Sequence, residues 1–149
     1  MVNKISEEKR KKIMGSIKGK NTKLESMVSK ELWHRGIRFR KNVKSLYGTP
    51  DIAIKKYKIV IFIDSCFWHA CELHGTLPQK NQMFWIKKFN RNKERDFEVN
   101  NYYIQKQWHL LRIWEHDLKR DFVGSINKIV NLIKFSKMIN TTKNKQNYL

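Results

Sequence analysis

The spacing of apolar residues predicts helices in four segments of the chain. Thr22-Lys23-Leu24-Glu25 has the form of a capping box, and the apolar positions behind it follow helical spacing as far as Gly36. A long helix is predicted over about residues 83–107, and a last helix is predicted from Asp121 onward. A short basic helix is expected near the N-terminus, at about residues 6–14.

Shorter apolar runs predict strands between these helices. Residues 37–40 predict a short strand, residues 52–54 and 59–63 predict a hairpin around 55–58, and residues 110–114 predict a further strand. The run 59–63 is apolar at every position, which is typical of a central strand covered on both faces. The order helix, strands, helix, strand, helix predicts an α/β domain in which helices flank a mixed β-sheet.

The length of the chain indicates one domain. With 149 residues, of which 40% are hydrophobic, the chain can form a single compact core. We expect residues 1–149 to form that domain, with residues 1–20 as a basic N-terminal helix or arm and residues 140–149 as a frayed polar tail.

The charge of the chain points to a polyanionic partner. Lys and Arg number 32 against 13 Asp and Glu, which gives a formal net charge of +19. Self-repulsion of this size raises the energy of the compact state, and a polyanion relieves it. Nucleic acid fits best, because each neutralised phosphate also releases condensed counterions. A merely soluble basic protein is the alternative.

Membrane insertion and export are not expected. The longest apolar run, residues 59–63, is far shorter than the roughly 20 residues that a spanning helix needs. No apolar signal-peptide core follows the N-terminal lysines. Cys66 and Cys71 lie beside histidines, a pattern that suits a metal ion better than a disulfide. The expected setting is therefore the cytoplasm.

Two aspartates flank the predicted hairpin and form a candidate acidic centre. Asp51 follows Pro50 before the first strand, and Asp64 closes the second, so pairing of the strands can bring both to one end of the sheet. Two adjacent carboxylates repel unless a hard cation such as Mg²⁺ holds them. Bound Mg²⁺ would stabilise charge on the reacting phosphate and could lower the pKa of an attacking water. The alternatives are a turn residue at Asp51 and a solvent-facing strand end at Asp64.

This acidic spacing resembles the Pro-Asp…acid arrangement of the restriction-endonuclease-like nucleases. Their usual third element, acid-x-Lys, is missing, because Ser65 and Cys66 follow Asp64. Glu25 could also face the active end of the sheet, although its place in the capping box is a sufficient structural explanation.

The segment 66–74 carries a candidate zinc site. Cys66, Cys71 and His74 supply three ligands within one short loop, and His116 is the leading candidate for the fourth position of a tetrahedral structural site. A loop as long as residues 65–82 in a small domain needs something to order it, and zinc would do so. The alternative is two buried thiols with unrelated histidines.

Other residues of this loop are candidates for catalysis and DNA contact. His69 lies five residues beyond Asp64 and could act as a general base, or be a satisfied structural histidine. Phe67 and Trp68 are adjacent, so in extended backbone both cannot face the core, and with Trp85 they could form a wedge between base steps. Ordinary core aromatics are the alternative. Nearby basic residues would hold the DNA backbone: Lys80, Lys87, Lys88, Arg91, Lys93 and Arg95.

Taken together, these motifs resemble those of the very-short-patch repair endonucleases, the Vsr-type DNA mismatch endonucleases. The resemblance covers about residues 10–118. Its motifs are Met14-x-x-Ile17, Thr22-x-x-Glu25, Gly36-x-x-Phe39-Arg40, Pro50-Asp51, Cys66-Phe67-Trp68-His69, Cys71-x-x-His74, Phe84-Trp85, Asn92-x-Glu94-Arg95-Asp96 and Trp114-Glu115.

The resemblance implies an enzyme that recognises a T:G mispair, left by deamination of 5-methylcytosine, and cuts the strand 5′ to the mispaired thymine. It implies that Asp51 binds catalytic Mg²⁺, that His69 takes part in hydrolysis and that Glu25 supports it. It also implies zinc binding by Cys66, Cys71, His74 and His116, and intercalation by Phe67, Trp68 and Trp85. The last zinc ligand is often Cys in this family, so His116 is assigned only from its position in the chain. Asp117 is the alternative. The Ile63 carbonyl is an alternative to Asp64 as the second magnesium ligand.

Two other functions remain open from the sequence: a restriction-type endonuclease that cuts matched DNA, and a zinc-braced DNA-binding protein without catalysis. An RNA-binding module is less favoured, because no RNP-type aromatic signature is evident. The expected partners are double-stranded DNA with a T:G mismatch, mismatch-repair accessory proteins and a functionally linked cytosine methyltransferase. A monomer associated with a prokaryotic nucleoid is expected.

Overall fold

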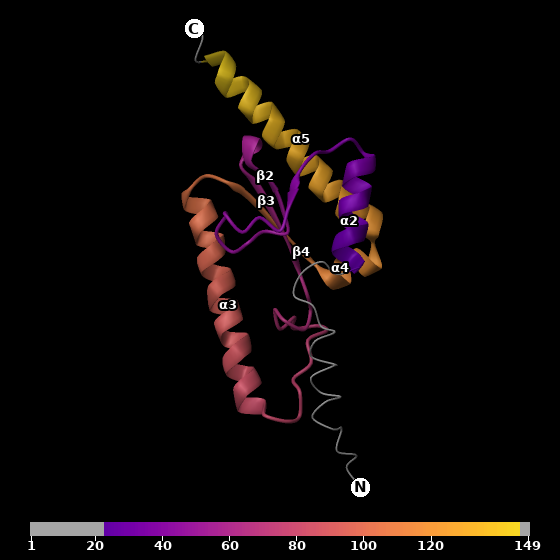
Figure 1. The fold of residues 1–149 in the computed structure, drawn as a ribbon, viewed down its shortest axis with the longest axis vertical. Helices are drawn as coiled ribbons and strands as arrows, with labels where there is room; N and C mark the ends of the chain where they lie inside the picture. Colours follow the sequence, from indigo (N-terminus) through magenta and orange to yellow (C-terminus); the bar gives the residue numbers. More distant parts are fainter. Residues whose placement is uncertain (1–22, 147–149) are drawn as a thin grey trace.

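The computed structural model describes residues 23–146, which form a sheet with helices on both of its faces (Figure 1). The expected N-terminal arm and Thr22 of the capping box lie outside the described residues. The elements, in chain order, are α2 (Lys23–His34), β1 (Arg40–Lys41), β2 (Ile52–Ile54), η1 (Lys55–Tyr57), β3 (Ile59–Asp64), α3 (Gln82–Gln105), β4 (His109–Trp114), α4 (Glu115–Arg120) and α5 (Phe122–Gln146).

The four strands form one mixed sheet in the order β1-β2-β3-β4. The pairs β1–β2 and β2–β3 are antiparallel, whereas β3 and β4 are parallel. The predicted hairpin is present, with Ile52 opposite Ile61. The α/β prediction is therefore confirmed.

The two faces of the sheet carry separate apolar clusters, which explains why β3 is apolar throughout. Side chains alternate between the faces of a strand. Ile59 and Ile61 belong to the cluster that includes residues of α2, α4 and α5, whereas Val60 and Phe62 belong to the cluster that includes residues of α3. Figure 1 shows α3 on one side of the sheet and α2 and α5 on the other.

The connection from β3 to β4 decides where the functional residues meet. Two parallel strands need a long crossover, and here the segment 65–108, with α3, supplies it. The C-terminal ends of β3 and β4 consequently lie side by side, with Asp64 paired to Trp114. Because β2 is antiparallel to β3, its beginning lies at the same end.

Some element bounds differ from the sequence prediction. The strand predicted at 37–40 is Arg40–Lys41, because Gly36 ends α2 with a positive φ of 78° and buried Ile37 then packs in the core. The short helix α4 was not predicted. Asp121 follows α4, and its Oδ1 accepts a hydrogen bond from the Gly124 amide in the first turn of α5.

The expected fraying over residues 140–149 is wrong for 140–146, where α5 continues to Gln146. Propagating an existing helix is much easier than starting one. The hydroxyls of Thr141 and Thr142 also donate to the backbone carbonyls of Lys137 and Met138. Within residues 23–146, no helix is long and apolar enough to cross a membrane.

Candidate active site and metal centre

Cys66, Cys71, His74 and His116 form a cluster that could hold a metal ion. Their donor atoms all lie within 4.8 Å of one another. His116 Nδ1 lies 3.3 Å from Cys66 Sγ and 3.5 Å from Cys71 Sγ, and His74 Nδ1 lies 3.9 Å from Cys71 Sγ. With a Zn–S distance of about 2.3 Å and a Zn–N distance of about 2.1 Å, a tetrahedral site has S···N edges of about 3.6 Å. The spacing and the donor types therefore fit zinc.

Local backbone turns bring the donors of the loop together. The Cys71 amide donates to the Cys66 carbonyl over 2.9 Å, and the Gly75 amide donates to the Cys71 carbonyl over 2.7 Å. A Cβ at Gly75 would clash with that carbonyl, so glycine permits the turn after His74.

The fourth donor comes from α4, directly after β4. The parallel pairing of β3 and β4 carries His116 to the two thiols. Asp117, the alternative ligand, instead contacts the other ring nitrogen of His116, with its Oδ1 3.5 Å from Nε2. A carboxylate in this position orients a metal-binding imidazole.

Cys66 must lose its proton before it can bind a cation at this cluster. Burial raises the pKa of the Cys66 thiol, and the neighbouring Cys71 raises it further, although a hydrogen bond to the His116 backbone lowers it. Thiolates are the metal-binding form of cysteine. A positive ion would offset this raised pKa.

Asp51 is fixed beside the end of β3. Its Oδ2 accepts a hydrogen bond of 2.7 Å from the Ile63 amide, and its carbonyl accepts one of 3.0 Å from the Asn42 amide. The paired strands thus bring Asp51 next to the residue that precedes Asp64.

Asp64 is buried, so a solvent-facing strand end, one of the alternatives from the sequence, is wrong. Its two carboxylate oxygens lie 2.9 and 3.2 Å from Arg112 Nη1, and Oδ1 lies 3.5 Å from His69 Nε2. Burial raises the pKa of Asp64, even though His69 and Arg112 act to lower it. A metal ion at Asp64 would compete with the Arg112 guanidinium, which makes Asp51 the better-placed carboxylate for a cation.

His69 is held between two carboxylates. Its Nδ1 lies 2.5 Å from Asp96 Oδ2, and its Nε2 faces Asp64. Burial lowers the pKa of His69, but the hydrogen bond to Asp96 and the charges of Asp64 and Asp96 outweigh it, so the pKa is raised. If the Nδ1 proton is donated to Asp96, Nε2 keeps its lone pair and can accept a proton.

Asn92, Asp96 and Arg112 are functional candidates that the sequence did not indicate individually. Asn92 Nδ2 donates to the Trp68 carbonyl over 2.9 Å, and Asp96 binds His69. Helix α3 therefore holds both Trp68 and His69 of the loop. Asn92 and Asp96 could have been recognised together in the sequence, because residues four positions apart lie on the same face of a helix. Arg112 was detectable as a charged residue inside an apolar strand, because a buried charge needs a partner.

The three aromatic candidates form one packed cluster. Phe67 lies 5.0 Å from Trp68 and 5.5 Å from Trp85 between ring centroids. The loop turns at Phe67 and Trp68, since the His69 amide donates to the Ser65 carbonyl, so the extended backbone considered from the sequence is absent. Trp85 is buried and does not project, whereas the adjacent Phe84 is 57% exposed.

Glu25 is buried in the first turn of α2, on the face that carries Val28 and Leu32. Carboxylates are seldom fully buried without partners. Thr22, its partner in the predicted capping box, lies outside the described residues, so the capping role of Glu25 and its supporting role in catalysis both stay predictions.

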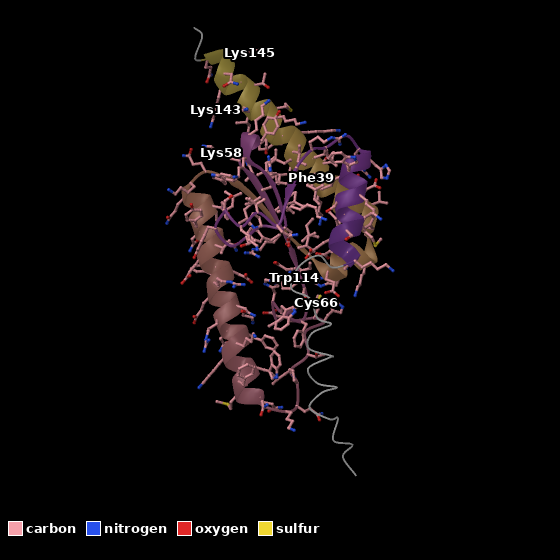
Figure 2. All side chains as sticks on the ribbon, viewed as in Figure 1. Phe39, Lys58, Cys66, Trp114, Lys143 and Lys145 are labelled. Atoms are coloured by element: carbon pink, nitrogen blue, oxygen red, sulfur yellow. The ribbon has the colours of Figure 1, made fainter. Side chains whose placement is uncertain are left out.

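A cavity of about 480 Å³ joins the two clusters. It is lined in part by Asp64, His69, Asp96, Arg112 and His116. Figure 2 shows Cys66 and Trp114 at this end of the sheet, far from Lys143 and Lys145 on α5. Two of the catalytic candidates, Asp64 and His69, thus share one cavity with Cys71 and His116 of the metal cluster.

Comparison with known proteins identifies the class of this domain as a DNA endonuclease. The family described as "DNA mismatch endonuclease Vsr" matches residues 2–74. The chain is 42% identical over 123 residues to the Type II nicking enzyme V.HpaIIP of Haemophilus parainfluenzae, covering 80% of this chain and 87% of that protein. It is 36% identical over 135 residues to the Type II nicking enzyme V.NmeDIP of Neisseria meningitidis serogroup C, covering 89% of this chain and 91% of that protein.

A further relative is the DNA mismatch endonuclease Vsr of Escherichia coli (strain K12). It is 34% identical over 112 residues, which cover 74% of this chain and 71% of that protein. The chain therefore belongs to the Vsr endonuclease family.

Proposed function

We propose that this endonuclease nicks one DNA strand 5′ to the thymine of a T:G mispair, such as deamination of 5-methylcytosine leaves, by Mg²⁺-dependent hydrolysis on a restriction-endonuclease-like fold. One observation carries the proposal. The hydrogen bond from the Ile63 amide to Asp51 holds a carboxylate at the end of β3, where His69 and Asp96 also meet. Membership of the Vsr family supports the mismatch as the substrate.

Asp51 would bind the magnesium ion, with the Ile63 carbonyl or Asp64 as the second protein ligand. Bound Mg²⁺ would supply positive charge to the reacting phosphate and lower the pKa of the attacking water. The pairing of Asp64 with Arg112 favours the Ile63 carbonyl.

His69 would remove the proton from the attacking water through Nε2. Asp96 would hold the ring orientation and keep the Nδ1 proton in place, as the carboxylate of a catalytic triad does. Arg112 balances the charge of Asp64 and lies 3.6 Å from Asp96, so it would limit repulsion between these carboxylates and the phosphate. Glu25 would support this centre from α2.

Cys66, Cys71, His74 and His116 would bind a structural zinc ion. Four protein donors complete a tetrahedral shell and leave no position for a reacting water, which distinguishes a structural site from a catalytic one. The ion would fix the loop that carries His69.

Phe67, Trp68 and Trp85 would contact the bases beside the mispair. Lys88 lies over the Trp68 ring, with its Nζ 5.1 Å from the centroid, so a phosphate-binding cation accompanies the cluster. Because Trp85 is buried, insertion would require the cluster to open, and exposed Phe84 would be the first ring to meet DNA.

A mispair in one strand requires only one active site, so we propose a monomeric enzyme. The origin of the mispair links it functionally to a cytosine methyltransferase, and mismatch-repair accessory proteins would act on the nicked product.

A nicking assay tests this function. Labelled duplexes with randomised flanks would carry either a T:G pair or the matched C:G pair and would be incubated with Mg²⁺. We expect single-strand cleavage of the T:G duplex alone. Cleavage of both strands of the matched duplex would indicate a restriction enzyme, and binding without cleavage would indicate a non-catalytic protein.

A further inference from the structure

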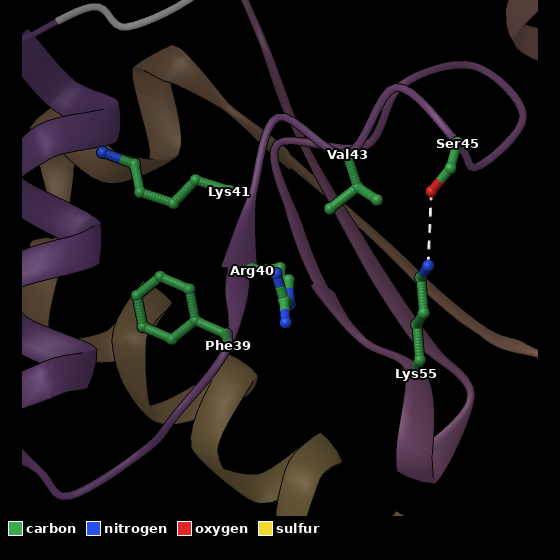
Figure 3. A pocket seen from close by; sticks show the side chains of 6 residues that line it. All are labelled: Phe39, Arg40, Lys41, Val43, Ser45 and Lys55. Atoms are coloured by element: carbon green, nitrogen blue, oxygen red, sulfur yellow. Dashed lines mark hydrogen bonds between the residues drawn. The ribbon is translucent and has the colours of Figure 1, made fainter.

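A second concave surface lies along the free edge of the sheet, outside the catalytic cluster. This edge groove has a volume of about 900 Å³ (Figure 3). It is lined by Phe39, Arg40, Lys41, Val43, Ser45 and Lys55. Three of these six residues are cationic and none is acidic, so the groove suits an anion.

The cations of the edge groove are available for an external partner. The ion pairs found within residues 23–146 use other basic side chains, namely Arg35, His69, Arg112, His116, Lys119 and Arg120. Lys55 Nζ donates to Ser45 Oγ over 3.2 Å, which positions its charge without neutralising it. Figure 3 shows Arg40 and Lys41 leaving β1 in different directions, so they place a cation on either side of the edge strand.

The edge groove begins beside the proposed catalytic end of the sheet. Lys41 pairs with Ile52, and the next residue, Asn42, donates its amide to the Asp51 carbonyl. From Asp51 to Lys55 the chain advances four residues, three of them up to the end of β2, so it covers at most about 13 Å at a strand rise of about 3.3 Å per residue. One DNA strand presents a phosphate about every 3.4 Å along the axis, so at most about four phosphates span this length.

We infer that the edge groove binds consecutive phosphates of duplex DNA on one flank of the cleavage position. The inference rests on the proposed function only in taking Asp51 as the place of cleavage. Contacts of this kind carry no sequence information but fix the register of the duplex on the protein. Here they would align the strand so that the scissile phosphate reaches Asp51.

A charge-neutralised variant, Arg40→Gln/Lys41→Gln/Lys55→Gln, tests the groove. Its affinity for a matched duplex would be measured without divalent metal, between 50 and 200 mM salt. Loss of three phosphate contacts should make the slope of log affinity against log salt shallower by about 2.7, at about 0.9 per contact. The wild type would then gain about 40-fold more affinity than the variant on going from 200 to 50 mM salt.

A matched control separates the groove from general charge. Lys106→Gln/Lys128→Gln/Lys134→Gln removes the same charge from exposed positions directly after α3 and on α5 and should keep the wild-type slope. An equal loss of slope in both variants would overturn the proposal, as would a wild-type slope in the groove variant.

Protection of lysines gives a direct readout of position. Saturating duplex should protect Lys41 and Lys55 from acetylation, as read by mass spectrometry, while Lys128 stays reactive. Full reactivity of Lys41 and Lys55 in the complex would overturn the proposal. Neither measurement requires cleavage or a mispair, so a failure of the proposed function would be seen separately, in the nicking assay.

Discussion

Two aspartates at the end of β3 differ in their surroundings. Asp51 accepts a backbone amide hydrogen bond, whereas Asp64 is buried and paired with Arg112. This difference is the reason for proposing that Asp51 binds the metal ion and that Asp64, paired with Arg112, does not, although both carry the same functional group.

Asp51→Asn should abolish nicking while leaving DNA binding nearly intact. The amide removes the negative charge that holds Mg²⁺ but preserves the size of the side chain. Loss of an outer-shell partner costs about 10- to 100-fold, so loss of a direct ligand should cost more than about 100-fold in the nicking rate. Single-turnover nicking and the DNA dissociation constant measure both effects. Glu98→Gln, on the exposed surface of α3, is the control, and near-wild-type nicking by Asp51→Asn would contradict the assignment.

Asp96→Asn should slow the chemical step by about 10- to 100-fold, a part of what general base catalysis contributes. The amide removes the charge that stabilises protonated His69 and can impose the wrong tautomer. Single-turnover rates and the DNA dissociation constant separate this effect from binding, which should not change. The ring-nitrogen NMR signals of His69 should shift as the tautomer changes. An unchanged rate would show that His69 needs no orienting carboxylate.

Arg112→Met should destabilise the fold by about 3 kcal/mol, because it leaves the Asp64 carboxylate buried without its cation. The double variant Arg112→Met/Asp64→Asn should recover part of that loss, since the uncompensated charge is gone. Denaturant unfolding of the two variants and of Asp64→Asn measures the coupling. Additive losses would show that the pair contributes nothing specific.

At the scale of elements, the loop 65–81 is held by local turns and side-chain contacts and not by a helix or strand of its own. Its backbone hydrogen bonds are local turns, and its ends are anchored by β3 and α3. Asn92 and Asp96 of α3 attach it from one side, and His116 of α4 attaches it from the other.

Cys71→Ser should therefore lose the bound zinc and lower the melting temperature. A hydroxyl is a poor replacement for a thiolate ligand, and the binding free energy of a structural zinc contributes to folding. Metal content by mass spectrometry and thermal unfolding measure the two effects. Glu72→Gln, at the adjacent exposed position, should change neither. Wild-type metal content in Cys71→Ser would remove this residue from the site.

The elements also show where sequence patterns predict well. The positions of α3, β2 and β3 followed from apolar periodicity, because each buries a continuous stripe or face. The short helix α4 and the end of α5 were not predicted, since α4 has one buried residue and the last residues of α5 are exposed.

At the scale of the whole molecule, the excess of 32 basic over 13 acidic residues suits an enzyme that acts on DNA. The acidic side chains of the site are concentrated where β3 and β4 end, and cations of the edge groove lie nearby on β1. The basic and the acidic side chains are therefore separated, as the proposed binding of a polyanion and of a metal ion requires.

The fold class, the family motifs and the residues of the candidate metal cluster could be predicted from the sequence, because they depend on residue type and on spacing within short segments. Four features became visible only in the folded chain: Arg112 pairs with Asp64, Asp96 binds His69, His116 rather than Asp117 lies against the thiols, and Trp85 is buried. These contacts join segments far apart in the chain, and they depend on the parallel register of β3 and β4 and on the packing of α3. Local residue patterns carry no record of that register.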